Sequence, residues 1–171
     1  MKSFWSLLWA ARFIAKWEGF LPVAVWDTLA SPDILTQGYG HTHFAGEPIP
    51  REGTRWSKAK ALRVLAHDAS AVARHLASVV RHKLTVRQRI AMISFGFNLG
   101  TGAIDDLAPL LNRGEIKRAA DKMLEYNHAG GVVVEGLTNR RKAERWMMLH
   151  SRPRHRNPHK ATPHRRNHAH S

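Results

Sequence analysis

Glu18 and Asp27 are two carboxyl side chains nine residues apart, in a segment that reads EGFLPVAVWDTLASPDILTQGYGHT from residue 18 to 42. The apolar residues before Glu18 recur at helical spacing and place it near a helix end, where the helix dipole disfavours an ionised carboxylate, as would burial against Trp17 or Trp26. Asp27 falls in a polar, turn-rich stretch, where a carboxylate stays charged. One protonated and one charged carboxyl can form an acid–base pair that hydrolyses a glycosidic bond. Judged by spacing alone, the two residues are more often simply an acid at a frayed helix end and an acid that starts a turn.

The first elements around these residues follow from the hydrophobic pattern. Apolar residues recur at helical spacing between residues 4 and 15, which predicts a first helix that ends close to Glu18. Proline and glycine interrupt residues 21–50 at seven positions, as in a small and irregular β-hairpin region. The carboxyls would therefore be held by a helix end and a hairpin.

A long helix is predicted to begin after Ser57, a good N-cap, and to carry an apolar stripe on one side. Over about 24 residues it would extend about 36 Å, enough to connect two lobes. Thr85 and Gln88 have the spacing of a capping box that opens the next helix, which Gly100 and Gly102 end. Shorter helical patterns follow at 104–112, 115–126 and 138–150.

Together these elements predict an α+β fold within residues 1–150. Residues 1–56 would form a small lobe of helix and β-hairpin, 57–81 a connecting helix, and 82–150 an all-helical lobe. A cleft between the lobes could hold a polymer. Residues 151–171 have almost nothing to bury and are expected to form a disordered tail rich in Arg and His.

The composition points to an anionic partner and excludes thiol chemistry. The net charge is +14 and the pI about 11.2, and cysteine is absent, so no disulfide or thiolate can contribute. The apolar run from Ser3 to Ala11 is too short to span a bilayer and has no convincing signal-peptide cleavage site. We therefore expect an amphipathic first helix, no transmembrane segment and no signal peptide.

The tail 151–171 carries six of the 27 Lys and Arg residues, five of the 12 His and no acidic residue. Basic arms of this composition bind polyanions. We predict attachment to an anionic envelope polymer such as lipopolysaccharide, stronger at mildly acidic pH, where histidines gain protons. The alternative is an inert or solubilising tail. Residues 1–150 still carry a net charge of +8 without these six charges, so this part of the chain is basic as well.

Four blocks of residues resemble glycoside hydrolase family 24, the phage lysozymes or endolysins. The first combines Glu18 and Gly19 with Asp27, Thr36 and the run GYGHT at 38–42. The other blocks read SFGFNLG, AGG and GLTNRRKAE, at 94–100, 129–131 and 136–144. They occur in the order of the family and spread over most of the chain. The resemblance implies a lysozyme-like fold with the lobes described above.

The resemblance also implies hydrolysis of the β-1,4 bond between N-acetylmuramic acid and N-acetylglucosamine in peptidoglycan, with no cofactor. Glu18 matches the general acid, Asp27 the carboxylate that positions water, and Thr36 the hydroxyl beside that water. Members with this triad are described as inverting. Inversion implies carboxyl groups about 6.5–9.5 Å apart, with room for a water between them.

One feature departs from the family pattern, in which the Thr follows the Asp after six residues. Here nine residues separate Asp27 from Thr36, which implies a three-residue insertion within residues 29–34. Counting six from Asp27 leads to Asp33, so Asp33 is an alternative second carboxylate. Gln37 stands where the family usually has an apolar residue, and the sequence assigns it no role.

Three further positions are predicted to bind substrate. Asn98 resembles a residue that hydrogen-bonds an N-acetyl group or a sugar hydroxyl in the cleft, and a helix C-cap is its structural alternative. Arg140 or Arg141 resembles an arginine that contacts the catalytic Glu. We favour Arg140, against the alternative of a solvated basic helix face. Trp26, beside Asp27, is a candidate platform for a sugar ring.

His41 is predicted to form an ion pair with Asp68 that holds the hairpin to the long helix, as in the lysozymes that the chain resembles. His41 and His43 could also be read as metal ligands two residues apart. No third ligand stands at a suitable position, so no metal site is predicted.

Three functions remain to be separated. The first is a monomeric muramidase that is made in the host bacterial cytoplasm and reaches peptidoglycan in the periplasm or cell wall after release. The second is a catalytically impaired lysozyme fold that only binds peptidoglycan, which the insertion alone favours. The third is a nucleic-acid-binding protein, prompted by the charge but supported by no nucleic-acid motif. We expect the first.

Overall fold

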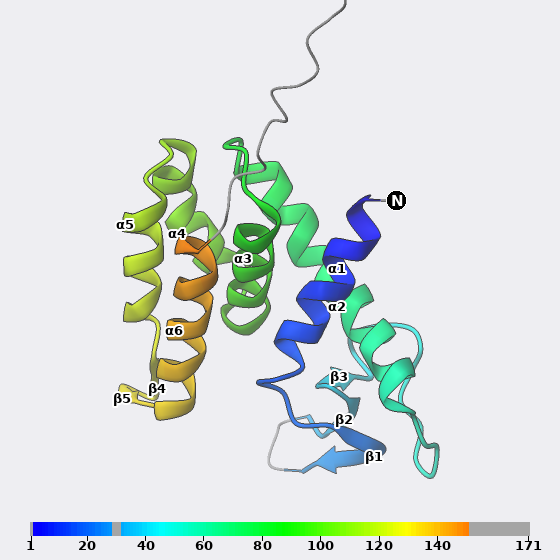
Figure 1. Cartoon of the computed structure of the whole chain (residues 1–171). Helices are drawn as coiled ribbons and strands as arrows, with labels where there is room; N and C mark the ends of the chain where they lie inside the picture. The colour runs from blue at the N-terminus through cyan, green and yellow to red at the C-terminus, as the bar shows by residue number, and fades with distance from the viewer. Residues whose placement is uncertain (1, 29–31, 151–171) are drawn as a thin grey trace, which may run out of the picture.

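The structure, a computed structural model, describes residues 2–28 and 32–150, with side chains from residue 6 onward. The predicted tail, 151–171, and residues 29–31 of the predicted insertion lie outside this part of the chain. Figure 1 shows the order of the elements. They are α1 (Lys2–Ile14), β1 (Leu21–Asp27), β2 (Ile34–Gly38), β3 (His41–Thr42), α2 (Lys58–Val79), α3 (Val86–Leu99), α4 (Thr101–Asn112), α5 (Ile116–Lys122), the 3₁₀ turn η1 (Met123–Glu125), β4 (His128–Ala129), β5 (Val132–Val133) and α6 (Glu135–Leu149).

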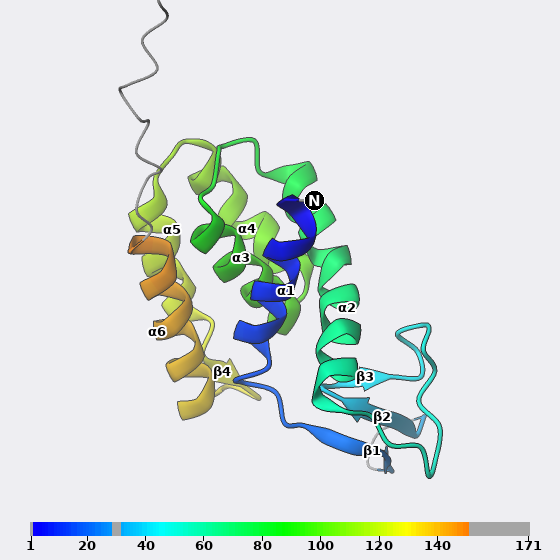
Figure 2. The same cartoon turned by 45° about the vertical axis from the view of Figure 1, so that its right-hand side comes forward.

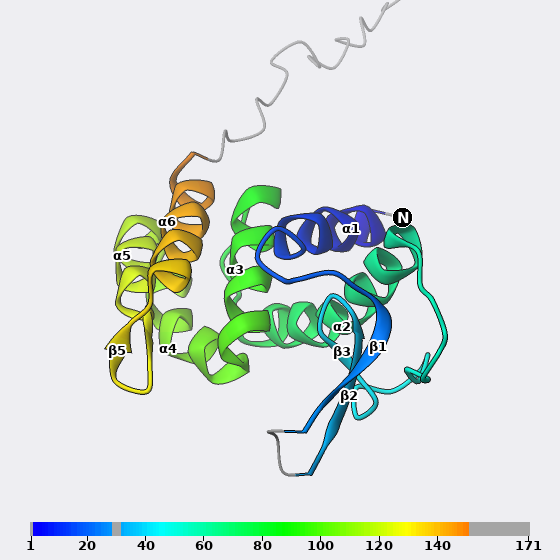
Figure 3. The same cartoon turned by 90° about the horizontal axis from the view of Figure 1, so that it is seen from below.

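The helices gather into one body, and the antiparallel sheet β1-β2-β3 lies at one end of α2 (Figures 1 and 2). Helix α2 contacts β2 and β3 as well as α3 and α4, so its 22 residues connect the sheet to the helical body. Helix α1 packs against α2 and α3. Figure 3 shows β1 and β2 projecting away from the helices. The predicted α+β fold is confirmed, and the exact lobe boundaries stay a prediction.

Three helix boundaries follow the predicted capping residues. Ser57 Oγ accepts a hydrogen bond from the backbone N–H of Lys60 at the start of α2. Thr85 and Gln88 form both bonds of the capping box at the start of α3. Gly100 caps the end of α3 with a φ of 87°. These predictions hold because each cap is made by residues close in sequence.

Two predicted boundaries were wrong. Helix α1 ends at Ile14, and a turn carries the chain on to Glu18, whose N–H still donates to the Ile14 carbonyl at 3.3 Å. Gly102 does not end a helix, since it lies in the first turn of α4. The positive φ of Gly100 is enough to end α3, and a glycine in a first turn does not prevent the next helix.

A second hairpin, β4–β5, was not predicted. Ala129 pairs with Val132 across Gly130 and Gly131, whose φ values are 57° and 81°. A two-residue hairpin loop with positive φ at both positions is what Gly-Gly favours, but strands of two residues are too short to give an alternating pattern. Figures 1 and 3 show both hairpins at the same end of the molecule, with the link from α1 to β1 running between them.

Gln37 has a structural role that the sequence did not assign. Its side chain is fully buried, and its amide donates to the carbonyl oxygens of Pro22 at 3.1 Å and Thr54 at 2.8 Å. The Thr54 hydroxyl donates to its Oε1 at 3.4 Å. These bonds tie β2 to the start of β1 and to the loop before α2, which an apolar side chain could not do.

The main core lies among the helices, with Phe95 of α3 fully buried. At Gly96, a β-carbon would lie 2.4 Å from Ile104 Cδ1 and 2.8 Å from Val72 Cγ1, so α3 approaches α2 and α4 closely at this point. Within residues 2–28 and 32–150, no helix is both long and apolar enough to cross a membrane.

Candidate active site

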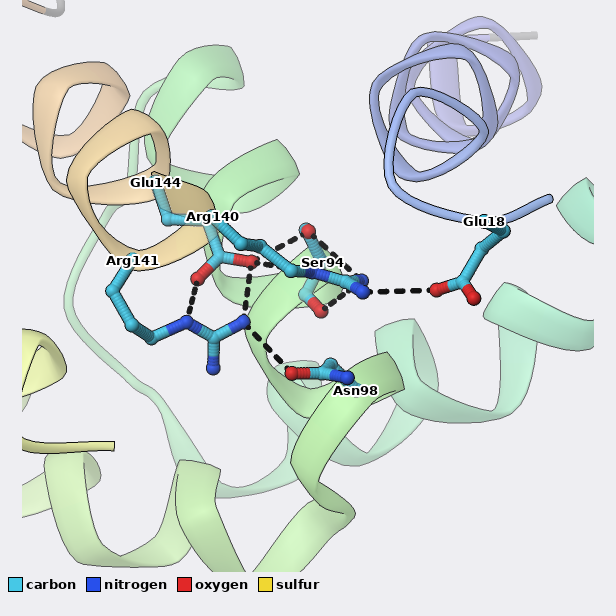
Figure 4. Close-up of polar contacts among 6 residues, drawn as sticks. All are labelled: Glu18, Ser94, Asn98, Arg140, Arg141 and Glu144. Carbon is cyan, nitrogen blue, oxygen red and sulfur yellow. Dashed lines mark hydrogen bonds and ion pairs between the residues drawn. The ribbon is translucent and has the colours of Figure 1, made fainter. Parts of the chain in front are cut away.

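Glu18 lies in the turn between α1 and β1, and its side chain is 27% exposed. Arg140 Nη1, from α6, donates to Glu18 Oε1 at 2.9 Å (Figure 4). The contact that we predicted for Arg140 is therefore present. A bond between a guanidinium and a carboxylate is charge-assisted, and it fixes the direction of the Glu18 side chain. Within the described residues, Arg140 is the hydrogen-bond partner of this carboxylate, through Oε1.

Asp27 and Thr36 lie on the same face of the β1–β2 hairpin. In the register of the two strands, Val25 stands opposite Thr36 and Asp27 opposite Ile34. Because side chains alternate along a strand, Asp27 and Thr36 are diagonal neighbours on one face, typically about 7–8 Å apart. Asp27 is exposed and Thr36 half-buried. The segment in which the sequence predicts an insertion, residues 29–34, lies almost entirely between these two strands in the sequence.

Asp33 lies just before β2 and lines a hollow on the surface. Asp27 and Thr36 are not among the residues that line it. The lining residues are Trp26, Thr28, Pro32, Asp33, His43 and Phe44. The structure thus groups Asp33 with Trp26 and not with Thr36.

Trp26 stands opposite Leu35 in the register, on the hairpin face that Asp27 does not share. Its ring is 45% exposed, and its indole N–H donates to a carboxylate oxygen of Glu52. The ring also lies edge-on to His43, with centroids 5.9 Å apart. Its proposed contact with a sugar ring stays a prediction.

Arg141 does not reach Glu18 but donates from Nη2 to Asn98 Oδ1 at 3.0 Å. Both Arg140 and Arg141 are buried, so the alternative of a solvated helix face is wrong. Gly100 is the C-cap of α3, so the helix-cap alternative for Asn98 is wrong as well. The role of Asn98 in binding substrate stays a prediction, as does that of Arg140.

Glu144 and Ser94 were not predicted as site residues. Glu144 is fully buried, and its Oε1 accepts hydrogen bonds from Ser94 Oγ at 2.6 Å and Arg141 Nη2 at 3.1 Å. Burial raises the pKa of Glu144, although its arginine neighbours and Ser94 act in the opposite direction. Burial also lowers the pKa of Arg141 to about 10. The sequence carried one signal, since Glu144 follows Arg140 and Arg141 by four and three residues, the spacings of neighbours on a helix.

The predicted ion pair between His41 and Asp68 is confirmed. His41 Nδ1 lies 2.8 Å from Asp68 Oδ2, and its Nε2 lies 3.2 Å from the carbonyl of Gly46. Burial lowers the pKa of His41, but the hydrogen bond and charge of Asp68, with the carbonyls of Gly46 and Pro48, raise it more, so that the net pKa lies above its ordinary value. The pair ties the sheet to α2, with the His41 ring 5.7 Å from that of Trp56.

His43, the other histidine of this strand region, accepts a hydrogen bond at Nδ1 from the backbone N–H of Leu35. In the part of the chain that the structure describes, no group of three or more His, Cys, Asp and Glu residues could hold a metal ion.

Known proteins resemble this chain over most of its length. The endolysin of Bacillus phage B103 is 30% identical over 140 residues, which cover 81% of this chain and 51% of that protein. The SAR-endolysin of Bacteriophage PS119 is 33% identical over 118 residues, 68% of each chain. The chain thus spans about half the length of the first relative and about two thirds of the second.

Among solved structures, a mutant of P22 lysozyme superposes with a TM-score of 0.72 at 30% identity, covering 82% of this chain and 94% of the other. The family model for phage lysozyme matches residues 15–144, from the turn before Glu18 to Glu144 itself. Sequence and fold agree over the whole region that holds the candidate site, and this chain belongs to the phage lysozyme family.

Proposed function

We propose that this chain is a muramidase, an endolysin that hydrolyses the β-1,4 bond between N-acetylmuramic acid and N-acetylglucosamine in peptidoglycan. The position of Glu18 carries this proposal. Its carboxyl is partly exposed and is held at Oε1 by the buried guanidinium of Arg140. A carboxyl so held can present its other oxygen, with a proton, to a glycosidic oxygen.

The chemistry follows from the charges at the site. Glu18 donates a proton to the leaving glycosidic oxygen while a water, held by Asp27 and the Thr36 hydroxyl, attacks the anomeric carbon from the opposite face. Asp27 accepts the proton of that water, and the anomeric centre is inverted. Arg140, 2.9 Å away, stabilises the negative charge that remains on Glu18 after proton transfer.

The choice of Asp27 as the second carboxylate is supported by the strand register. Asp27 shares a face with Thr36, whereas Asp33 lines a hollow with Trp26. A water that contacts both a carboxylate and a hydroxyl requires the two groups on one face. This favours Asp27 over Asp33.

The proposed substrate places the enzyme at the cell wall. We propose that the protein acts as a monomer, after release from the host cytoplasm, on peptidoglycan in the periplasm or wall. The basic segment 151–171 would bind an anionic envelope polymer. Truncation after His150 should then weaken lysis of intact cells while lysis of permeabilised cells is unchanged. Equal lysis of both by the two forms would remove this role.

The test of the catalytic proposal compares wild type with Glu18→Gln on purified peptidoglycan, by release of reducing ends. Loss of the general acid should lower the rate by about 100-fold or more. Glu125→Gln is the matched control, because Glu125 is exposed, lies in the 3₁₀ turn η1 and is not one of the residues assigned to the site. Proton NMR of the first product should show the inverted anomer.

Three outcomes would change the proposal. Equal rates for wild type and Glu18→Gln would remove Glu18 as the acid. If neither protein releases reducing ends but both sediment with peptidoglycan, the chain is a lysozyme fold that binds the polymer without cutting it. Retention of the product anomer would instead remove the inverting mechanism.

A further inference from the structure

The fully buried carboxylate of Glu144, between α3 and α6, takes no direct part in the proposed chemistry. Three donors converge on its Oε1: Ser94 Oγ at 2.6 Å, Arg141 Nη2 at 3.1 Å and Arg140 Nε at 3.4 Å. Arg141 Nε lies 2.9 Å from the other oxygen, Oε2. We call Ser94, Arg140, Arg141 and Glu144 the Glu144 network (Figure 4).

Each of the two arginines in the Glu144 network also bonds one side chain that lies outside the network. Arg140 Nη1 donates to Glu18 at 2.9 Å, and Arg141 Nη2 donates to Asn98 at 3.0 Å. The arginine side chains are 4% and 0% exposed, whereas Glu18 is 27% exposed and Asn98 half-buried. The Glu144 network therefore lies beneath two side chains that a ligand can reach.

The guanidinium of Arg140 is held on two sides by the network itself. Its Nε faces Glu144, and its Nη2 donates to the Ser94 carbonyl at 3.3 Å and to the Ser94 hydroxyl at 3.4 Å. Because a guanidinium is planar and rigid, two fixed directions determine the third. Ser94 and Glu144 together therefore determine that Nη1 points at Glu18.

Burying these charged groups costs desolvation free energy, so the Glu144 network is not the most favourable way to pack α3 against α6. Both side chains are fully buried, and this burial raises the pKa of Glu144 and lowers that of Arg141 to about 10. Apolar side chains of similar volume would hold α3 against α6 at least as well. What the charged groups add is a fixed direction for each guanidinium, which apolar packing cannot supply.

We propose that Ser94 and Glu144 are positioning residues, which hold the guanidinium of Arg140 against Glu18 and that of Arg141 against Asn98 without touching the substrate. This inference rests on the proposed function. The Arg140 branch acts on kcat, because Arg140 stabilises Glu18 after proton transfer. The Arg141 branch acts on KM, because Asn98 is predicted to bind substrate.

Ser94→Ala tests the Arg140 branch by removing one hydroxyl, and Ser78→Ala, which removes an exposed hydroxyl from α2, is the matched control. kcat and KM are measured on purified peptidoglycan, in the wild-type and Arg140→Gln backgrounds. We expect Ser94→Ala to lower kcat about tenfold with KM nearly unchanged. In the Arg140→Gln background it should lower kcat no further, because residues that act through one another are not additive. Ser78→Ala should change neither constant.

Glu144→Gln tests both branches, since it keeps the shape of the side chain and removes the charge that Arg140 and Arg141 face. We expect kcat to fall and KM to rise together. Thermal unfolding of each variant shows whether it is folded. Should Glu144→Gln fail to fold, Ser94→Ala still decides the Arg140 branch.

Two results would overturn the positioning role: the same fractional loss of kcat for Ser94→Ala with and without Arg140, or a lower unfolding temperature with kcat unchanged. Glu18→Gln, measured alongside, separates this inference from the proposed function. Full activity of Glu18→Gln removes the proposed function. An inactive Glu18→Gln together with additive losses for Ser94→Ala leaves the function standing and removes the positioning role alone.

Discussion

Arg140 and Glu18 are 122 positions apart in sequence, and their side chains form a hydrogen bond of 2.9 Å. The contact joins the link between α1 and β1 to α6. Because the Arg140 side chain is buried and Glu18 is partly exposed, the bond connects the interior to the proposed reaction site. The predictions below concern this arginine, the second carboxylate, the His41–Asp68 pair and the close packing at Gly96.

Arg140→Gln should destabilise the protein by about 3 kcal/mol, because it leaves the buried carboxylate of Glu144 with one cationic partner fewer. Arg145→Gln, on the same helix, is the control. Arg145 bonds Asp121 where both side chains are over a third exposed, so its loss should cost less than about 1 kcal/mol. Urea unfolding of the three proteins measures both effects. Equal losses for the two variants would contradict the importance of burial.

Asp27→Asn should lower kcat by about 100-fold, because the amide cannot accept the proton of the attacking water. Asp33→Asn should keep the rate within a few-fold of wild type, because Asp33 lines a hollow apart from Thr36. The release of reducing ends from peptidoglycan measures both. The reverse ranking would assign the second carboxylate to Asp33.

His41→Gln should destabilise the protein more at pH 5.5 than at pH 9. The pKa of His41 is raised in the folded state, so its pairing with Asp68 contributes fully below the ordinary histidine pKa, about 6.5. The contribution is lost as pH rises through the raised value. Unfolding temperatures of wild type and variant at both pH values test this. A difference that grows with pH would show that the pair does not stabilise through its charged form.

Gly96→Ala should destabilise the protein by about 1–3 kcal/mol, because the added methyl would overlap Ile104 and Val72 in the core. Gly102→Ala is the matched change, since a β-carbon at Gly102 meets nothing within 4 Å. There alanine should stabilise slightly, because it reduces the freedom of the unfolded chain. Thermal unfolding distinguishes the two, and similar unfolding temperatures for both variants would mean that α3 can shift to make room.

Much of the fold could be predicted because its signals are local. Ser57 and the Thr85–Gln88 capping box mark helix starts through bonds between residues three apart. The hairpin β4–β5 was missed because its pairing is only two residues long on each strand. The end of α1 was placed too late because a turn continues the helical pattern beyond Ile14.

The candidate site was only partly predictable. The Glu18–Arg140 and His41–Asp68 contacts were predicted from a family resemblance, since nothing in their spacing shows that they meet. The burial of Glu144 was missed, because a charged side chain in a basic helix is expected to be exposed to solvent when only the sequence is known. Its partner Ser94 comes from another helix, and only the packing of α3 against α6 brings the two together.

The dependence of Glu18 on α6 has a consequence for synthesis. Ribosomes add about 5–20 residues per second, so Arg140 is made on the order of ten seconds after Glu18. Once Thr36 has been added, the growing chain carries Glu18, Asp27 and Thr36, yet the guanidinium that bonds Glu18 does not exist until Arg140 is made. Fragments that end before α6 therefore carry Glu18, Asp27 and Thr36 without the arginine that bonds Glu18.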